Sequence, residues 1–417
     1  MRRALRGGRL ARSLRGLLPL LALFVSCGAL AAETPPRIGT RIGNGDGGVS
    51  AFYRWDGAPD GPPGRLLRSE DLPGRGSMAG AGLARRILYS SRDGLDGRPI
   101  AVSGQLFLPA GAPPAGGWPL LAWAHGTVGV GDRCAPSWSG PGARMREWFG
   151  QWLAQGYAVV ATDYQGLGTP GPHPYLAKRA EARSVLDSAR AAIGAGLGIG
   201  NRVVVAGQSQ GGGAAFAAAA FAPDYAPELG LRGTIATGIP YLHEGTRMVS
   251  GVPPEAVDPG LAYVFYAALL AFQQDPSLDP AEIFTERALP LLAAAPEACV
   301  GELASQVAAA GLTQRNALRP GAIEALTPRL LPLFRYPTLR LAQPLMVGTG
   351  AEDRDVSAAS QQALVRDACA AGTTVEAYLY RGEGHGGAWL ASWPDAFRFA
   401  RRVVAGEPVP PRCEAGG

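Results

Sequence analysis

Metal-binding and nucleic-acid-binding signatures are absent from this sequence of 417 residues. None of its five cysteines forms a C-x-x-C pair and no H-E-x-x-H motif occurs, so we expect neither a zinc site nor a metal-dependent mechanism. No basic run follows residue 31, and we therefore expect no nucleic-acid partner. No apolar run reaches the roughly 20 residues that a membrane-spanning helix needs, so we expect no stable membrane span.

The excess of positive charge belongs to the amino-terminal segment. Residues 1–31 hold six arginines and no acidic residue, and the rest of the chain has 33 basic and 34 acidic side chains. An arginine-rich start, an apolar stretch at 17–25 and an A-x-A cleavage site at 29–31 are together typical of a signal peptide. We therefore expect residues 1–31 to be removed on export and the mature protein to be secreted, periplasmic or at the cell surface.

Two alternatives for this segment stay open. The apolar stretch could act as a membrane anchor, although Pro19 interrupts it and it is shorter than a membrane span. Cys27 could be lipidated, because residues 24–27 loosely resemble a lipobox, with Phe24 where leucine is usual.

Short, continuously apolar runs that alternate with helical patterns predict an α/β fold. Runs of this kind are typical of strands that are buried on both faces, as in a parallel sheet. Two earlier runs, 87–90 and 102–108, alternate apolar with polar or small residues and predict half-buried strands. The continuous runs are 120–124, 158–162, 203–206, 234–237 and 345–348, and the helical patterns are 145–155, 178–195, 213–221 and 357–371. We therefore expect a mostly parallel sheet flanked by helices.

The chain divides into a core in two parts and an insertion. Residues 32–80 are rich in glycine, proline and arginine and predict an irregular amino-terminal segment. Residues 81–240 and 336–417 hold the strand patterns of the core. Residues 241–335 carry helical patterns, at 261–274, 281–294 and 301–310, without a strand pattern. They are too many for an ordinary crossover, so we expect an inserted helical cap or lid. A long set of crossover helices is the alternative.

A G-x-S-x-G motif at 207–211 marks Ser209 as the candidate nucleophile. A predicted strand precedes the motif and a helix of small residues follows it, which is the context of a nucleophile elbow. Glycines suit this turn because side chains beside the serine would clash. The amino terminus of the following helix presents N–H groups to developing negative charge. The alternative is a glycine-rich turn with an idle serine.

A serine hydroxyl needs a base to become a nucleophile, and we assign that role to His385. This histidine follows the last predicted strand, 374–380, in a glycine-flanked loop from which its ring can reach over the sheet edge. The chain has three other histidines, which precede the candidate acid or lie in other loops. These are His125, His173 and His243, and we expect them to be structural.

The carboxylate that orients the base is expected between the serine and the histidine, which is the order found in α/β-hydrolases. A loop that follows a predicted strand offers Glu352, Asp353 and Asp355. We choose Asp353, because it fits a G-x-x-D-x-x-V spacing together with Gly350 and Val356. The other two are then solvated loop carboxylates.

The oxyanion hole is expected to combine the backbone N–H of Gln210 with one near Thr127. Gln210 directly follows Ser209, and Thr127 closes the H-G-T element at 125–127, which ends a predicted strand. The alternative for this element is an ordinary strand-ending turn.

Three parts of the chain together resemble the secretory lipases (lipase A-like) of the α/β-hydrolase superfamily. The resembling segments are H-G-T-V-G at 125–129 leading to 134–137, D-Y-Q-G-L-G at 163–168 leading to 173–176, and G-Q-S-Q-G-G-G at 207–213. The similarity extends over about residues 80–400. It implies a lipase or carboxylesterase with the α/β-hydrolase fold, an inserted helical cap and no cofactor. The family's catalytic serine, aspartate and histidine fall on Ser209, Asp353 and His385, and the implied partners are small-molecule or lipid esters, with transient contact to lipid surfaces.

Two other functions fit the same pattern less well. A serine peptidase or amidase of this fold would use the same three residues. A non-catalytic binding protein could keep the fold, but without selection for activity mutations would soon replace the serine, the aspartate or the histidine. The complete serine, aspartate and histidine in the α/β-hydrolase order therefore favour an enzyme.

Disulfides are predicted by the cysteines that follow the signal peptide, because an even number in an exported chain is typical of such bonds. We expect Cys134 to pair with Cys299, which would tie the insertion to the loop after His125. We expect Cys369 to pair with Cys413, which would hold the proline-rich carboxyl-terminal tail.

Residues 261–272 form an apolar segment without a charged side chain, although a surface helix should show a polar face. The segment is too short to span a bilayer. We expect it either to be buried in the insertion or to lend one side to an acyl pocket above Ser209. In the second case Phe265 and Leu269 would face the acyl chain, and acyl chains longer than acetyl would be preferred.

Overall fold

The computed structural model describes residues 48–72, 78–243, 246 and 250–414. The predicted signal peptide and Cys27 lie outside these residues. Within them, no helix is long and apolar enough to cross a membrane. The same residues contain no cluster of three or more His, Cys, Asp or Glu side chains that could hold a metal ion.

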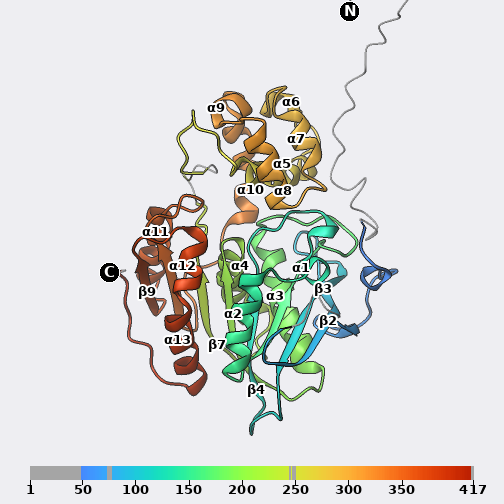
Figure 1. The fold of residues 1–417 in the computed structure, drawn as a ribbon, viewed down its shortest axis with the longest axis vertical. Helices are drawn as coiled ribbons and strands as arrows, with labels where there is room; N and C mark the ends of the chain where they lie inside the picture. The colour runs from blue at the N-terminus through green and yellow to red at the C-terminus, as the bar shows by residue number, and fades with distance from the viewer. Residues whose placement is uncertain (1–47, 73–77, 244–245, 247–249, 415–417) are drawn as a thin grey trace, which may run out of the picture. The chain divides into compact units, whose positions relative to one another are not determined.

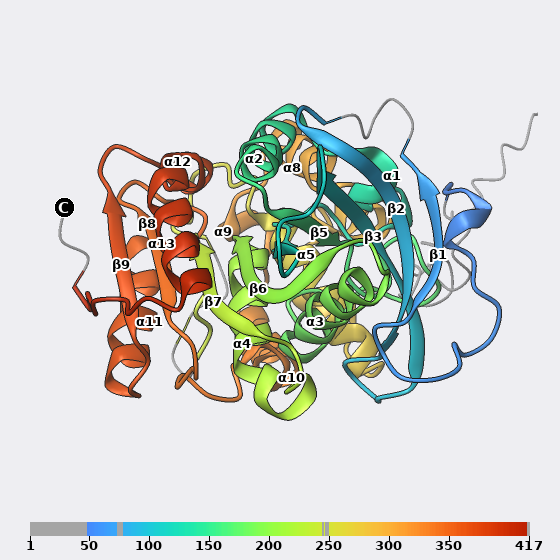
Figure 2. The same cartoon turned by 90° about the horizontal axis from the view of Figure 1, so that it is seen from below.

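The described residues contain one mixed sheet of nine strands, in the order β1-β2-β3-β5-β4-β6-β7-β8-β9 (Figure 1, Figure 2). Neighbouring strands are antiparallel from β1 to β5 and parallel from β5 to β9. The strands are β1 (Leu66–Asp71), β2 (Ala81–Arg92), β3 (Pro99–Pro109), β4 (Trp118–Ala124), β5 (Ala158–Thr162), β6 (Ile199–Gln208), β7 (Leu231–Thr237), β8 (Leu345–Gly350) and β9 (Val375–Tyr380). The mostly parallel sheet predicted from the sequence is confirmed.

Helices cover both faces of this sheet, which explains its continuously apolar strands. Val203 and Val205 of β6 pack on the side of α3 and α4, whereas Val204 and Ala206 pack on the side of α2 and α13. Alternate residues of a strand point to opposite faces, so both sets are buried. The helices and short turns of the core are η1 (Ala51–Tyr53), η3 (Asp132–Cys134), α1 (Pro136–Ser139), α2 (Ala143–Ala154), α3 (Lys178–Gly194), α4 (Gln210–Tyr225), α11 (Ala358–Ala370), α12 (His385–Ala391) and α13 (Trp393–Ala405).

The segment at 32–80, expected to be irregular, contains the strand β1 at one edge of the sheet. β1 pairs antiparallel with β2, from Leu66 opposite Tyr89 to Asp71 opposite Arg85. Its sequence L-L-R-S-E-D lacks a regular alternation, because an edge strand is paired on one side only and carries exposed charges. The expectation was therefore wrong for residues 66–71, since pairing with β2 and not a local pattern defines the strand.

Between β7 and β8, the described residues form the helices α5 to α10, which we call the insertion helices. Figure 1 shows them gathered beyond one end of the sheet. They enclose an apolar core around α5, and Tyr175, from the loop between β5 and α3, is buried in the same core. The insertion helices are α5 (Leu261–Gln274), α6 (Pro280–Ile283), α7 (Leu289–Ala294), α8 (Val300–Ala309), α9 (Gln314–Ala317) and α10 (Ala322–Phe334).

The helical pattern at 281–294 differs from the expectation, since it forms α6 and α7 instead of one helix. Phe284, between them, has extended backbone angles and forms an isolated β-bridge with Leu318. The Phe284 ring is fully buried and packs on the Phe265 ring, with centroids 5.1 Å apart. Tertiary contacts therefore interrupt a segment that its local pattern predicts to be helical.

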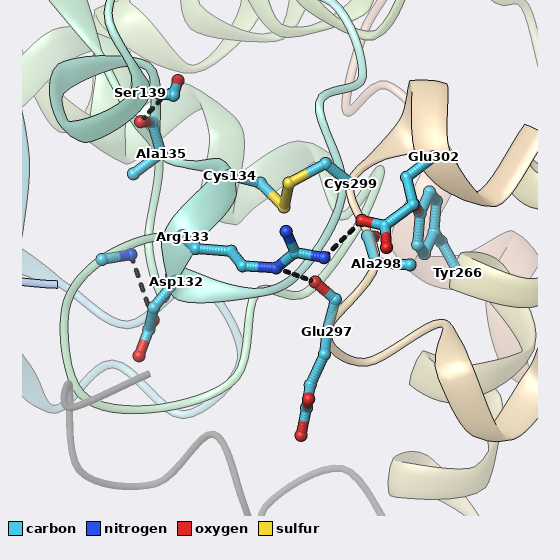
Figure 3. Close-up of a disulfide and its surroundings, with 11 residues drawn as sticks. Asp132, Arg133, Cys134, Ala135, Ser139, Tyr266, Glu297, Ala298, Cys299 and Glu302 are labelled. Atoms are coloured by element: carbon cyan, nitrogen blue, oxygen red, sulfur yellow. Dashed lines mark hydrogen bonds and ion pairs between the residues drawn. A yellow bond between two sulfur atoms is a disulfide. The ribbon is translucent and has the colours of Figure 1, made fainter. Parts of the chain in front are cut away.

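The predicted disulfide between Cys134 and Cys299 is confirmed. It joins η3, in the loop after β4, to the start of α8, with the two Cα atoms 5.5 Å apart (Figure 3). Beside it, the Val300 N–H donates to the Val128 carbonyl oxygen at 2.8 Å. Arg133 also forms an ion pair with Glu302 across the same contact. The loop after β4 is therefore held to the insertion helices by covalent, backbone and ionic contacts.

The predicted disulfide between Cys369 and Cys413 is also confirmed, and it joins α11 to the carboxyl-terminal tail. The tail runs along β9, where the Arg412 backbone N–H donates to the Val375 carbonyl oxygen and the Arg412 carbonyl oxygen accepts from the Ala377 N–H. This disulfide therefore fixes the tail at the edge of the sheet that lies farthest from β1.

Candidate active site

Ser209 occupies a sharp turn between the end of β6 and the start of α4. Its φ of +60° and ψ of −124° are unusual for a residue with a side chain, and such strain is frequent at functional sites. A Cβ atom at Gly207 would clash with the Gly211 carbonyl, and one at Gly211 would clash with the Ala124 carbonyl. The Ser209 N–H donates to the Thr237 carbonyl oxygen at 2.9 Å. The turn therefore has the tight geometry that the motif predicts.

Asp353 and His385 are in direct contact. Asp353 lies in the turn after β8, and His385 is the first residue of the short helix α12 and not part of a plain loop. His385 Nδ1 is 2.7 Å from Asp353 Oδ2, and the carboxyl group is fully buried. Asp353 Oδ1 accepts hydrogen bonds from the N–H groups of Asp355 and Val356, and Gln361 Nε2 donates to Oδ2 at 2.9 Å. These donors fix the carboxylate with one oxygen toward the imidazole.

The His385 ring and Ser209 lie against the same turn after β7. The Ser209 N–H is bonded to Thr237, and a Cβ atom at Gly238 would lie only 2.8 Å from His385 Cε1. Gln208 Nε2 also donates to the His385 carbonyl oxygen at 3.4 Å. The hydrogen bonds of the described residues do not include one between Ser209 and His385. The structure thus brings the serine and the imidazole to one turn, and the imidazole to its aspartate.

The two competing carboxylates are placed differently from Asp353. Asp355 is exposed and lines a cavity that it shares with Ser209. The backbone N–H of Asp355 is bonded to Asp353, but its carboxylate does not contact the imidazole in the described hydrogen bonds. Glu352 is exposed, and its backbone N–H donates to Glu383. Of the three, Asp353 is the one bonded to His385.

The residues predicted for the oxyanion hole lie near Ser209. Thr127 and Gln210 line the same cavity as Ser209. Gly126 packs on the serine, since a Cβ atom added to it would lie 3.4 Å from Ser209 Cβ. Gln210 is the first residue of α4, where backbone N–H groups have no partner within the helix. Both predicted donors are therefore beside the candidate nucleophile.

A buried polar network behind Gln210 was not predicted from the sequence. Gln210 Nε2 lies 3.0 Å from Glu181 Oε1 and 3.2 Å from His173 Nε2. Glu181 is paired at 2.8 Å with Lys178, the chain's single lysine, and both side chains are almost fully buried. The spacing of Lys178 and Glu181, three residues apart on one helix, was the only sequence signal that could have revealed the ion pair.

The protonation state of His173 follows from its surroundings. Burial lowers the pKa of His173 to about 4, so the ring is neutral near pH 7. Its Nδ1 is 2.9 Å from the Gln165 carbonyl oxygen and must carry the proton, because a carbonyl oxygen can only accept. His173 Nε2 is therefore free to accept from the Gln210 amide. The network fixes the side chain of the residue that follows the nucleophile.

His125 has a structural position, as expected. Burial lowers the pKa of the ring, and its two nitrogens contact the carbonyl oxygens of Gly126 and Asp163. The Asp163 carboxylate accepts hydrogen bonds from the hydroxyl groups of Ser103 and Ser137. His125 and Asp163 therefore shape loops at the edge of the site without reaching the reacting groups.

A cavity of about 490 Å³ opens above Ser209, between the core and the insertion helices. Its apolar lining includes Leu176, Pro240, Val264, Leu326, Leu330 and Phe334. The helix α5 contributes Tyr263, Val264 and Ala267, as the pocket hypothesis expects. Phe265 and Leu269 were the wrong residues, because neither lines the cavity and both are buried in the core of the insertion helices. An all-apolar helix gives no sequence signal for which of its sides faces a cavity.

Comparison with known proteins agrees with this geometry. The family model described as Secretory lipase matches residues 148–311. None of the curated proteins matches the chain. Among solved structures, Candida antarctica lipase A in its closed state is similar, with a TM-score of 0.68, 18% identity and 88% of each chain covered. The rice cell wall degrading esterase LipA from Xanthomonas oryzae has a TM-score of 0.65 and 20% identity, over 83% of this chain and 97% of that one.

The solved structures and the family match support different conclusions. At such low identity, the solved structures establish the fold, which is the α/β-hydrolase fold. The family match supports an ester hydrolase. The resemblance of this chain to the secretory lipases is therefore confirmed.

Proposed function

We propose that the protein is a secreted serine ester hydrolase, a lipase or carboxylesterase, with Ser209 as its nucleophile. The observation that carries the proposal is the 2.7 Å contact of His385 with Asp353, together with the position of the His385 ring and the strained Ser209 against the same turn after β7. A nucleophile, a base and an orienting carboxylate from three separate segments of the chain are the parts that acyl transfer needs.

In the acylation step, His385 Nε2 takes the proton of Ser209 Oγ as this oxygen attacks the ester carbonyl carbon. Backbone N–H groups of Gln210 and Thr127 stabilise the negative charge that develops on the carbonyl oxygen. When the carbon–oxygen bond breaks, the imidazolium gives its proton to the departing alcohol and the acyl group stays on Ser209. Water then attacks the acyl-enzyme with His385 as base, which releases the acid and restores the serine.

Asp353 acts through the histidine. Because Asp353 Oδ2 accepts the Nδ1 proton, the ring is held in the tautomer whose Nε2 can accept a proton. The same carboxylate stabilises the imidazolium that forms in each half-reaction. The four donors around Asp353 keep this orientation between turnovers.

The substrate class follows from the cavity. Its volume lies within the usual range of small-molecule sites, and its lining is mainly apolar away from Ser209. Such a pocket fits the acyl chain of acylglycerols or other lipid esters. Transient contact with a lipid surface would supply these substrates. The arginine-rich amino-terminal segment and the two disulfides of the described residues support export.

The test of this function uses Ser209→Ala in the mature chain, with Ser305→Ala, an exposed serine on α8, as the matched control. Ser209→Ala should lower kcat for a p-nitrophenyl ester by roughly a million-fold and abolish labelling by a fluorophosphonate. Ser305→Ala should behave like the wild type. Residual activity of Ser209→Ala above a few per cent, or unchanged labelling, would refute the nucleophile.

The choice of substrate distinguishes an ester hydrolase from a peptidase. The wild type should hydrolyse p-nitrophenyl esters and leave an aminoacyl p-nitroanilide intact. Cleavage of the anilide at a comparable rate would move the assignment to a serine peptidase or amidase with the same three residues.

A further inference from the structure

The Thr127 side chain is held by a buried tyrosine. Thr127 Oγ1 is 2.7 Å from the Tyr175 hydroxyl oxygen. Thr127 follows β4 and Tyr175 precedes α3, so the contact joins two loops that meet beside Ser209. Thr127, Tyr175 and Ser209 all line the cavity, and Gly126, next to Thr127, packs on the serine side chain. A threonine hydroxyl is thus fixed within the cavity, close to the candidate nucleophile.

The direction of this hydrogen bond follows from the surroundings of Tyr175. Burial holds the pKa of the phenol well above its usual value, so the group keeps its proton. Among the hydrogen bonds of the described residues, Thr127 Oγ1 is the sole partner of this hydroxyl. If Thr127 donated, the phenol proton would have no acceptor in a buried position, which is costly. Tyr175 therefore donates, and the Thr127 proton is left to point elsewhere.

The ring of Tyr175 is itself held firmly. It packs edge-on against Tyr266, with centroids 5.7 Å apart, and against the His173 ring at 6.3 Å. The adjacent Leu176 has φ +62°, a strained angle for a residue with a side chain. Tyr175 cannot move away from Thr127 without disturbing these contacts. The position of the threonine oxygen is therefore set before a substrate arrives.

We propose that the Thr127 hydroxyl is a third hydrogen-bond donor of the oxyanion hole, and that Tyr175 positions it. This inference rests on the proposed ester hydrolase function of Ser209. The carbonyl oxygen gains negative charge as Ser209 attacks, and a donor already oriented toward it stabilises the transition state more than the neutral ester. Thr127 is then a catalytic residue through its side chain as well as its backbone N–H, whereas Tyr175 acts through Thr127.

The test compares variants that keep or remove each hydroxyl. Thr127→Val, which has the shape of threonine without its hydroxyl, should lower kcat about 100-fold and leave KM within about twofold. Thr127→Ser should recover most of this loss. Tyr175→Phe should lower kcat about tenfold in the wild type and cause no further loss in the Thr127→Val background. Tyr266→Phe is the matched control, because its hydroxyl donates to the Ala298 carbonyl oxygen outside the cavity.

Binding of a transition-state analogue provides a second measurement, which would not change if Thr127 had only a structural role. An alkyl boronic acid forms a tetrahedral adduct with a serine, and its inhibition constant should rise in Thr127→Val by about the same factor as kcat falls. The thermal midpoint of each variant is measured beside its kinetics. If Thr127→Val does not fold, Tyr175→Phe decides: a lower kcat at unchanged KM and thermal midpoint supports the proposal.

The outcomes separate this inference from the function on which it rests. A wild type that neither hydrolyses esters nor labels at Ser209 refutes the function, and the inference with it. An active, labelled wild type together with a Thr127→Val variant of unchanged kcat overturns the inference alone. So does a Tyr175→Phe variant with wild-type kcat, or one whose loss simply adds to that of Thr127→Val.

Discussion

His385 Nδ1 lies 2.7 Å from Asp353 Oδ2, and this contact distinguishes one carboxylate from its two neighbours in the same loop. Asp353 is fully buried at its carboxyl group and surrounded by donors, whereas Asp355 and Glu352 are both exposed. A carboxylate fixed in this way can hold the imidazole in one tautomer throughout a reaction cycle.

The first prediction is that Asp353→Asn lowers kcat by roughly 10,000-fold, because the amide no longer fixes the Nδ1 proton of His385. Asp355→Asn and Glu352→Gln should lower kcat less than about fivefold, since neither side chain is bonded to the imidazole. Steady-state kinetics with one p-nitrophenyl ester compare all three variants. A severe loss in Asp355→Asn with a mild one in Asp353→Asn would reassign the acid.

The second prediction concerns the cavity wall on α5. Val264→Trp fills part of the cavity, and kcat/KM for a long-chain p-nitrophenyl ester should fall at least about tenfold, while the value for the acetate should stay within about threefold. Leu269→Met, a volume-conserving change in the core of the insertion helices, is the control and should affect both esters alike. A series of acyl lengths measures the effect. Equal losses for short and long esters in Val264→Trp would show that the cavity does not hold the acyl chain.

The contrast between Val264 and Phe265 shows where sequence analysis reaches its limit. The sequence predicts an apolar helix over 261–274, and α5 has these bounds. Because every side of that helix is apolar, periodicity cannot separate the side that faces a cavity from the side that faces a core. That distinction depends on α10 and on the core loops, which contact α5 only in the folded chain.

The elements around Ser209 were predictable because their signals are local. The strand before Ser209 is a continuously apolar run, and the glycines at 207 and 211 are required by the close approach of neighbouring carbonyl groups. The network of His173, Glu181 and Gln210 was not predictable in the same way. Glu181 and His173 lie 29 and 37 residues from Gln210, and no local sequence pattern indicates contacts between them.

The third prediction separates the two disulfides by their effect on activity. Replacing Cys369 and Cys413 by serine should lower the free energy of unfolding by about 4 kcal/mol and leave kcat unchanged, because this bond holds only the tail. Replacing Cys134 and Cys299 by serine should cost about 5 kcal/mol, because the closed loop is longer. The second variant should also have a lower kcat, because the Cys134–Cys299 bond that it lacks fixes the loop that begins at Thr127.

Urea unfolding and steady-state kinetics of the two double variants supply the measurement. Kinetics are taken at a temperature where both remain folded, so that lost activity does not reflect lost protein. If the two variants kept equal kcat, the Cys134–Cys299 bond would be a purely stabilising link between the loop and the insertion helices.

The last prediction concerns the pH dependence of stability and the buried His173. Its pKa is about 4 in the folded protein and about 6.5 in the unfolded chain. Above pH 6.5 both states hold a neutral ring, and between pH 6.5 and 4 only the unfolded state takes up the proton. His173 therefore destabilises the fold progressively as the pH falls through this window, by up to about 3 kcal/mol. His173→Asn cannot titrate, so the gap in unfolding free energy between the wild type and this variant should shrink by about 2.5 kcal/mol from pH 7.5 to pH 4.5. Urea unfolding at several pH values measures both curves, and parallel curves would show that His173 is not held neutral in the fold.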